Sequence, residues 1–410
     1  MGGFMIKWWV LLTLYLTQGL PHGFFSQALP TLLRQQGMSL EAIGLMSLVS
    51  LPWVLKFLWA PLLDHYQPLK YVSLGRIDGH IRKTWIISAN ALAAMVLIFI
   101  ASIPLELWIN QAAIGLACAL LVLTLFVVTQ DIATDALAVE NIAANQRGLG
   151  NSVQVAGYRL GMIVGGGLLL AIFAQLGWHG TLWALAALMI LGLLPLWLWQ
   201  PLAVKPDKQP VFDHWLGFFR SPGTLAWLLL LLSYKVGDAF GTMMIRPQLV
   251  DLGVTLPEFA ELLGLWGTVA GLVGALLGGL ILTRLSRLYA LLLFLGLEAL
   301  AIAAYALLTS LDWTLIYSLI IAEHITGGMA TVALFTVMMD RCRPASAGSD
   351  YALQSCLVVL STLIASSMAG FSAAALGYAL HYALASGLCV LGLVFIVLNS
   401  ANVARLGSNQ

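Results

Sequence analysis

Residues 313–340, WTLIYSLIIAEHITGGMATVALFTVMMD, form an apolar stretch that is longer than a bilayer requires. A helix needs about 20 residues to cross the hydrocarbon core. Glu323 and His324 lie in the middle of this stretch. A carboxylate in hydrocarbon costs roughly 2.5–3.5 kcal/mol on insertion scales, so its presence points to a function. We predict that the segment spans a membrane and that Glu323 belongs to a pathway for something polar.

The rest of the chain repeats this pattern. Hydrophobic residues make up 60% and charged residues 9% of 410 positions, and the mean hydropathy is +0.94. A soluble domain carries about 25% charged residues. Further ionisable residues also fall inside apolar runs: Lys56, Asp131, Asp135, Arg159, Lys235, Asp238 and Glu298. Charged groups in several membrane helices indicate a transporter.

Composition and motifs exclude several other classes. The net charge is +1 and no Lys/Arg cluster is present, so nucleic acid is not an expected partner. The four cysteines show neither CxxC nor Cys/His metal spacing, and we expect no metal and no cofactor. Because HExxH and GxSxG motifs are absent as well, the sequence predicts that the protein is not an enzyme.

Twelve apolar runs are separated by polar breaks. Runs of this length are helices, since only helices and closed barrels span lipid. The sequence therefore predicts an all-α membrane protein with twelve transmembrane helices, at about 8–29, 41–63, 84–104, 109–139, 150–175, 180–200, 223–248, 258–283, 289–309, 313–339, 350–376 and 380–400.

Loop charges predict the orientation. If the N-terminus is cytoplasmic, fourteen Lys and Arg residues fall on the inside, against Arg34 and Arg246 on the outside. Cytoplasmic loops carry the excess of Lys and Arg in membrane proteins. We therefore expect both termini to be cytoplasmic. The expected location is a bacterial inner membrane.

A long break after the sixth run divides the chain in two. It contains Pro201, Pro206, Pro210 and Pro222. The expected organisation is a six-helix half at 1–200, a central cytoplasmic loop at 201–222 and a second six-helix half at 223–410. Glu140, Gly148 and Gln154 recur 200 positions later as Asp340, Gly348 and Gln354. Parallel six-helix repeats of this kind are the layout of major facilitator transporters.

The loop between the second and third predicted helices contains APLLDHY and, further on, GHIRKTW. It resembles the cytoplasmic signature of that superfamily, in which an acidic residue meets basic residues near a helix end. Here these residues are Asp64, Arg82 and Lys83, which we predict to form a solvent-exposed cytoplasmic gate. The alternative is that the cations only obey the positive-inside rule.

The buried charges do not balance. Five acids lie deep in the predicted helices against three bases, and a low-dielectric interior cannot hold all five as carboxylates. One or two of them should carry a proton part of the time, which proton coupling requires. We predict Glu323, Asp238, Asp131 and Asp135 as proton-coupling residues. Structural ion pairing is the alternative, and Glu298 is expected only to pack or to snorkel.

Two glycine stripes allow close helix packing. One contains Gly157, Gly161 and Gly165, and the other contains Gly267, Gly271, Gly274 and Gly278. Static packing is the simpler interpretation. A sliding contact between the halves is the alternative, because the two stripes lie on helices that face each other in this fold family.

Four motifs in order are similar to those of the muropeptide-permease (AmpG-like) branch of the major facilitator superfamily. They are VLKFLWAPLLDHY from Val54, QDIATDALAVE…QRG…AGYRLGM from Gln130, YKVGDAFG from Tyr234 and EHITGGM from Glu323. Muropeptide permeases are longer and have two additional helices. The chain most resembles the shorter, twelve-helix siderophore permeases of the rhizobactin and pyochelin type within that branch.

The predicted cargo site combines cations with aromatic walls. Arg159, Lys235 and Lys56 can anchor carboxylate or phenolate groups. Tyr158, Tyr234 and Gln130 complete the predicted set of substrate-binding residues. We expect Arg159, Lys235, Asp238 and Glu323 to converge on one cavity near the membrane midplane. Such a pocket suits an anionic cargo that contains an aromatic group.

These features lead to three hypotheses. The first is a monomeric, proton-coupled importer of a siderophore that works by alternating access. The second is a permease for muropeptides or another polar metabolite. The third is a membrane sensor that keeps the transporter fold, although no loop has room for an output domain.

Overall fold

The computed structural model describes residues 2–36, 38, 47–68, 80–201, 217–220 and 223–399. Within these ranges every regular element is a helix. The elements of the first part are α1 (Gly2–Gly23), η1 (Phe24–Ala28), α2 (Leu29–Gln35), η2 (Ser47–Ser50), α4 (Leu51–Leu55), η3 (Lys56–Leu58), α5 (Ala60–His65), α6 (Ile81–Ala101), α7 (Leu105–Gln111), α8 (Ala113–Asn141), η5 (Ala144–Gln146), α9 (Arg147–Met162), η6 (Ile163–Leu168), α10 (Leu169–Ala171), α11 (Phe173–Leu191) and α12 (Leu194–Leu198).

The remaining elements are α14 (Thr224–Tyr234), α15 (Val236–Thr242), α16 (Ile245–Asp251), α17 (Leu256–Phe259), η7 (Ala260–Gly267), α18 (Thr268–Ile281), α19 (Arg287–Ala304), η8 (Tyr305–Leu307), α20 (Trp313–Asp340), η9 (Pro344–Ser346) and α21 (Ala347–Leu398). The N-terminal part of the predicted second span, at 41–46, and most of the predicted central loop, at 202–216 and 221–222, lie outside the described residues.

Among the described residues, nine helices are long and apolar enough to cross a membrane. One of them, Pro344–Leu398, has 55 residues and bends at Gly377, whose φ is 73°. At 1.5 Å per residue, a straight helix of that length would exceed a bilayer more than twofold. Large apolar side chains such as Phe371, Leu300 and Leu225 are exposed, as expected for a surface that faces lipid.

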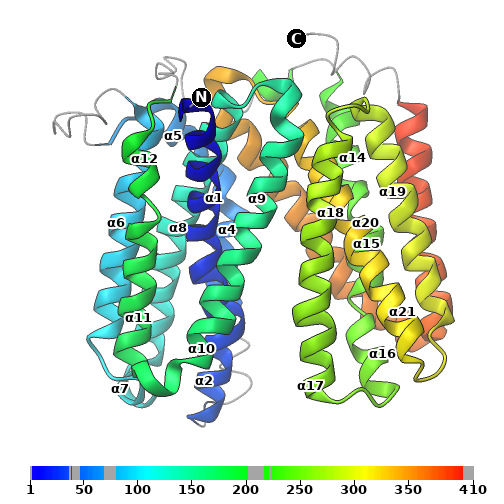
Figure 1. Ribbon diagram of the computed structural model, residues 1–410, viewed down its shortest axis with the longest axis horizontal. Helices are drawn as coiled ribbons and strands as arrows, with labels where there is room; N and C mark the ends of the chain where they lie inside the picture. Colours follow the sequence, from blue (N-terminus) through cyan, green and yellow to red (C-terminus); the bar gives the residue numbers. More distant parts are fainter. Residues whose placement is uncertain are drawn as a thin grey trace. The chain divides into compact units, whose positions relative to one another are not determined.

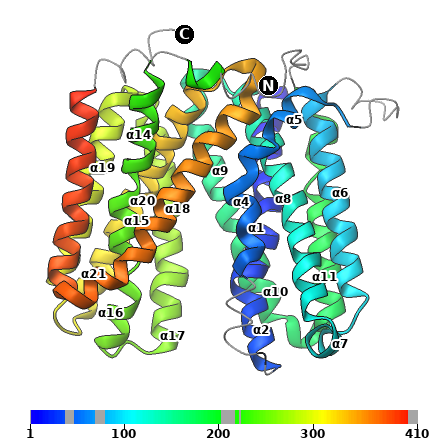
Figure 2. The same ribbon diagram turned by 180° about the vertical axis from the view of Figure 1, so that it is seen from behind.

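The chain forms two compact units. Unit 1 comprises Met1–Asn141, Val153–Trp215 and Arg343–Leu353, and unit 2 comprises Ile142–Ser152, Leu216–Cys342 and Gln354–Gln410. In unit 1, α6 packs along both α8 and α11 (Figure 1). In unit 2, α20 packs between α18 and α19 (Figure 2).

The first glycine stripe provides static packing inside unit 1. An added Cβ on Gly161 or Gly165 would overlap backbone carbonyl oxygens of α1, at Leu16 and Leu20. A Cβ on Gly157 would lie 2.7 Å from the carbonyl oxygen of Leu12. These glycines therefore let the α9–η6 helix lie directly against α1.

The second stripe does the same inside unit 2. An added Cβ on Gly274 would overlap the carbonyl oxygen of Ile325, and one on Gly278 would lie 2.9 Å from Cα of Met329. Both neighbours belong to α20. The nearest neighbours of Gly157, Gly161, Gly165, Gly274 and Gly278 thus support the interpretation of static packing, and a sliding contact stays a prediction.

Candidate functional site

Unit 1 contains one buried lysine between two carboxylates. Lys56 Nζ lies 2.6 Å from Asp131 Oδ2 and 3.8 Å from Asp135 Oδ2. The two aspartates are one turn apart on α8 and therefore share a face, as their spacing predicts. All three residues are buried. Removing an ion from water costs several kcal/mol, and here the close pairing offsets that cost.

Neutral groups complete this cluster. Tyr15 Oη donates to Asp135 Oδ1 over 3.0 Å, and Gln154 Nε2 donates to the same oxygen over 3.3 Å. Gln130, predicted to bind substrate, donates to Thr134 Oγ1 over 2.9 Å and is 1% exposed. Sequence reasoning missed Tyr15, and the only available signal was a tyrosine in the first apolar run. The cluster can hold two carboxylates around a single cation.

An aromatic group lies beside the cluster. The ring of His22 is 6.1 Å from that of Trp53 and 5.6 Å from that of Tyr158, centroid to centroid. Lys56 Nζ lies 5.8 Å from the centroid of Trp53, within range of a cation–π interaction. Arg159 follows Tyr158 on α9 and is half-buried.

A cavity of about 300 Å³ opens on this group within unit 1. Its walls come from α1, η1, α2, η2, α4 and α8 and include His22, Phe25, Ser26, Trp53 and Thr124. Phe25 and Ser26 belong to η1, a π-helical segment, and such segments are frequent at functional sites. The cavity combines mostly apolar walls with a few hydroxyl groups and an imidazole.

Unit 2 contains a second buried lysine between carboxylates. Lys235 Nζ lies 2.5 Å from Asp238 Oδ2 and 2.6 Å from Glu298 Oε1. The first pairing follows from the three-residue spacing, as predicted. The second corrects the sequence analysis: Glu298 is 0% exposed and pairs with Lys235, whereas it was expected only to pack or to snorkel. Tyr234, predicted to bind substrate, instead donates to the Leu291 carbonyl in the interior of the unit over 3.2 Å.

Glu323 is also buried in unit 2 and has two partners. Tyr305 Oη donates to Glu323 Oε2 over 3.2 Å, and His324 Nδ1 lies 2.7 Å from the same oxygen. The predicted convergence of Glu323, Asp238 and Lys235 with Arg159 stays a prediction, because Arg159 belongs to unit 1 and the other three belong to unit 2.

Of the predicted gate residues, Asp64 pairs with Arg82, whereas Lys83 binds elsewhere. Arg82 Nη2 lies 2.7 Å from Asp64 Oδ1 and 2.7 Å from Glu140 Oε1. Lys83 Nζ donates to the carbonyl oxygen of Trp199. The expectation of a solvent-exposed pair is wrong, because Asp64 is 1% and Arg82 3% exposed. The aliphatic surroundings of α5, α6 and α8 exclude water from these charges.

Asp64 also binds a helix N-terminus within unit 1. Its carboxylate accepts from the backbone N–H groups of Gly348, at 3.1 Å, and Ser349, at 2.8 Å, and from the Ser349 hydroxyl. These residues begin α21, where backbone N–H groups have no partner within the helix. An anion at this end is further stabilised by the helix dipole. Sequence reasoning missed Gly348 and Ser349 as partners.

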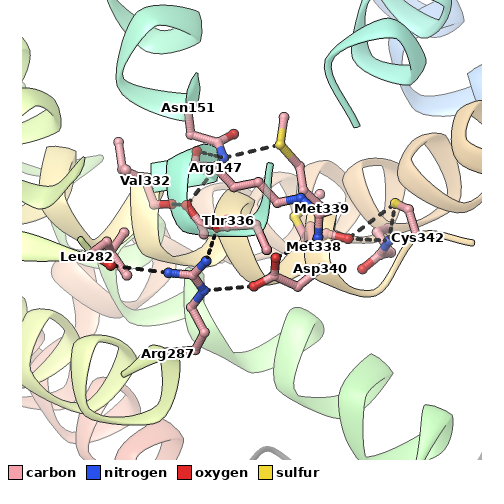
Figure 3. Close-up of polar contacts among 12 residues, drawn as sticks. Arg147, Asn151, Leu282, Arg287, Val332, Thr336, Met338, Met339, Asp340 and Cys342 are labelled. Atoms are coloured by element: carbon pink, nitrogen blue, oxygen red, sulfur yellow. Dashed lines mark hydrogen bonds and ion pairs between the residues drawn. The ribbon is translucent and has the colours of Figure 1, made fainter. Parts of the chain in front are cut away.

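A related network occupies the corresponding place in unit 2 (Figure 3). Asp340 accepts from Arg147 Nη1 and from Arg287 Nε, each at 2.7 Å. Arg287 is the first residue of α19 and Arg82 is the second residue of α6, and Asp340 is the repeat partner of Glu140. The pair of Arg82 with Glu140 in unit 1 therefore recurs as the pair of Arg287 with Asp340 in unit 2.

The end of α20 carries a further cation. The Arg341 guanidinium lies 5.7 Å from the ring centroid of Trp227, and burial lowers the pKa of Arg341 to about 10. Trp227 Nε1 donates to Gln354 Oε1 over 2.7 Å.

In the part of the chain that the structure describes, no group of three or more His, Cys, Asp or Glu residues could hold a metal ion.

Together these observations define a class. The chain is an all-helical, multi-pass membrane protein in which Lys–carboxylate clusters lie among membrane helices, and such buried charges mark transport pathways. The chain belongs to the Major Facilitator Superfamily, whose family model matches residues 11–366. It is a membrane transporter of that superfamily.

Several relatives are similar along most of their length. An anhydromuropeptide permease of Escherichia coli strain K12 is 33% identical over 403 residues, which cover 95% of this chain and 78% of the relative. An uncharacterised protein of Haemophilus influenzae is 30% identical over 381 residues, covering 88% of this chain and 86% of that protein. The chain is therefore a homologue of AmpG-like muropeptide permeases.

Solved structures support the fold. A bacterial homologue of the iron transporter ferroportin, in an outward-facing state, matches with a TM-score of 0.70 at 16% identity, covering 97% of this chain and 99% of that chain. The proton:xylose symporter XylE matches with a TM-score of 0.68 at 11% identity, covering 95% of each chain. At these identities the likeness concerns the fold alone.

Proposed function

We propose that the protein is a proton-coupled permease of the bacterial inner membrane that carries an anhydromuropeptide, a sugar–peptide, by alternating access. The observation that supports this cargo is the 33% identity to an anhydromuropeptide permease, which extends over 95% of the chain. The likeness extends along nearly the whole length of the chain. It favours the muropeptide hypothesis over siderophore import.

We infer twelve transmembrane helices with both termini in the cytoplasm. The bend at Gly377 lets Pro344–Leu398 supply two crossings, and the α1–α2 and η2–α5 segments supply two more. With the other eight long apolar helices, these make twelve. The excess of Lys and Arg in alternate loops supports the orientation.

Proton coupling is supported by the charge ratio in each cluster. In unit 1 one lysine faces Asp131 and Asp135, and in unit 2 one lysine faces Asp238 and Glu298 with Glu323 nearby. A second carboxylate beside the first is more stable with a proton in a low-dielectric site. Binding and release of that proton can be linked to exposure of the cargo site to either side.

Siderophore import is the second candidate. The cavity of unit 1 favours it, because Phe25, Trp53 and His22 offer flat surfaces for an aryl group. For an anionic chelate, Lys56 Nζ lies 5.8 Å from the ring centroid of Trp53, and Arg159 follows Tyr158, whose ring is 5.6 Å from that of His22. This cargo and a sugar–peptide make different demands on hydrogen bonding, so one experiment can separate them.

The test is uptake by cells that lack their own permeases. Cells that express this chain should accumulate a radiolabelled anhydromuropeptide, and a protonophore should abolish the accumulation. Accumulation of a ferric aryl siderophore and not of the muropeptide would overturn the proposal in favour of the second candidate. If the correctly inserted protein carries neither compound, a transporter-fold sensor becomes the better hypothesis.

A further inference from the structure

Five titratable side chains form a chain through unit 2. They are Lys235, which directly precedes α15, Asp238 on α15, Glu298 on α19, and Glu323 and His324 on α20. Lys235 Nζ lies 2.5 Å from Asp238 Oδ2 and 2.6 Å from Glu298 Oε1, and His324 Nδ1 lies 2.7 Å from Glu323 Oε2. Three helical segments that are distant in sequence thus bring these groups together.

Gly327 lies between Glu298 and Glu323, where the two parts of this series of side chains approach each other. A Cβ added to Gly327 would lie 3.3 Å from Glu323 Oε1 and 3.4 Å from Glu298 Oε1. The two carboxylate oxygens therefore face the same small space beside the α20 backbone. A side chain at position 327 would fill that space, and glycine keeps it open.

Exposure falls toward the middle of the chain from both ends. The exposed fraction of the side chain is 24% for His324, 8% for Glu323 and 0% for Glu298, and it rises again to 11% for Lys235 and 17% for Asp238. Glu298 is thus the most buried group, with a more exposed titratable group on each side. A relay through a buried group requires such a more accessible titratable group at each end.

One oxygen of Glu298 is left without a donor. Glu298 Oε2 is fully buried, and among the described residues no hydrogen-bond partner reaches it. A buried acceptor of a charged group without a donor costs more than an ordinary lost hydrogen bond. Because Lys235 is shared with Asp238, one cation serves two carboxylates here. A proton on Oε2 would both supply a bond to that oxygen and balance the charge.

We propose that Glu298 is the central proton carrier of unit 2 and that it exchanges its proton with Glu323 across Gly327. A half-turn of the protonated Glu298 carboxyl group about its Cγ–Cδ bond exchanges the positions of Oε1 and Oε2 and turns the proton toward the space beside Gly327. The O–H bond on one carboxyl group then breaks as an O–H bond forms on the other, and no electrons are transferred. When Glu298 is ionised it pairs with Lys235, and when it is protonated Lys235 pairs with Asp238 alone. This proposal rests on the proton coupling proposed above and assigns it to a residue of α19.

Two tyrosines near these five side chains have hydrogen-bond partners of their own. Tyr305 donates to Glu323 Oε2 over 3.2 Å, so it stabilises that carboxylate. Tyr234 donates to the Leu291 carbonyl, so its hydroxyl is committed to the backbone. From α21, the Cys389 Sγ packs against Gly237 beside Asp238. Lys235 and His324 are the two bases among these five titratable side chains.

The direct test is infrared difference spectroscopy of the purified full-length protein between acid and alkaline pH. The wild type should show a carbonyl-stretch band of a buried carboxylic acid that disappears as the pH rises. Glu298→Gln should lack this band, whereas Glu261→Gln, which alters an exposed acid of the same unit, should keep it. An unchanged band in Glu298→Gln would overturn the assignment. This readout needs no cargo, so its failure is distinct from failure of the proposed function.

A second test uses proteoliposomes with a trapped pH dye and an anhydromuropeptide as the cargo. Glu298→Gln should lower gradient-driven uptake and the accompanying proton flux by roughly 100-fold, as expected for loss of a positioned proton-transfer group. Cargo exchange without a gradient should stay near the wild-type rate. Equal loss of exchange and of gradient-driven uptake would indicate a purely structural role.

A glycine pair keeps the proposal testable if Glu298→Gln does not fold. Gly327→Ala places a methyl group against both carboxylates and should slow proton flux more than exchange. Gly296→Ala on α19 is the matched control, because its Cβ would meet only Leu393 Cδ1 at 3.9 Å. Equal proton flux in the two variants would contradict the exchange across Gly327.

Discussion

Asp64→Asn is expected to release the start of α21, in Arg343–Leu353, from the rest of unit 1. The carboxylate of Asp64 holds Arg82, the N–H groups of Gly348 and Ser349, and the Ser349 hydroxyl. An asparagine keeps the shape but has a single acceptor oxygen, and its NH₂ group would face donors. Arg82 keeps Glu140 as a partner at 2.7 Å, which limits the loss.

The magnitude follows from the bonds that are lost. Hydrogen bonds to charged groups contribute about 1.5–3 kcal/mol each, and at least one of the N–H bonds loses its charged acceptor. We expect a loss of roughly 2–4 kcal/mol in the attachment of Arg343–Leu353 to unit 1, allowing for the retained pair with Glu140. At about 1.4 kcal/mol per tenfold, the population with this segment detached should rise roughly 30-fold or more.

Native cysteines can report the detachment. Cys342 and Cys356 flank the segment and are buried, and Cys389 is a buried cysteine elsewhere in unit 2. The assay is the rate of thiol alkylation at each site in native membranes, in a Cys118→Ser background because Cys118 is exposed. Alkylation of Cys342 and Cys356 should accelerate in Asp64→Asn, while that of Cys389 should not change.

Two other results would refute this reasoning. If all three buried cysteines react faster by the same factor, Asp64 stabilises the whole fold and not the attachment of one segment. If none reacts faster, the four contacts of Asp64 contribute nothing measurable. Asp64→Glu is a useful control, because it keeps the charge but displaces the carboxylate and should give an intermediate rate.

Two further predictions concern unit 1. Gly165→Ala should lower the free energy of unfolding in detergent by about 1–3 kcal/mol, because its Cβ would overlap the Leu20 carbonyl. Gly167→Ala is the control and should be neutral or slightly stabilising, because open space surrounds Gly167. Equal melting temperatures of the two variants would contradict the close approach of η6 to α1. Lys56→Met should cost about 3–5 kcal/mol and abolish uptake, because it leaves two buried carboxylates without their cation. The double variant with Asp131→Asn should recover stability, and failure to recover would show that the pairing does not carry the effect.

Much of the local structure could be predicted from the sequence. Long apolar runs specify membrane helices because backbone polar groups must be satisfied within the helix, and the predicted run at 313–339 matches α20 closely. Short-range pairs followed from helix periodicity, as for Asp131 with Asp135 and Lys235 with Asp238. The repeat of Glu140 as Asp340 indicated two related halves, although it did not identify the partners of these residues.

Only the tertiary structure decided which distant groups meet. Glu298 was expected only to pack or to snorkel because its helix tends to be peripheral in this fold family, yet packing of α19 places it on Lys235. Asp64 was expected in an exposed pair, but the fold buries it against the start of α21. Hydrophobic periodicity indicates which residues are buried in a helix but carries no information on the neighbour across the interface, which depends on how the helices pack. The sequence by itself therefore determined the membrane helices and their charged residues, and the packing determined which charges pair.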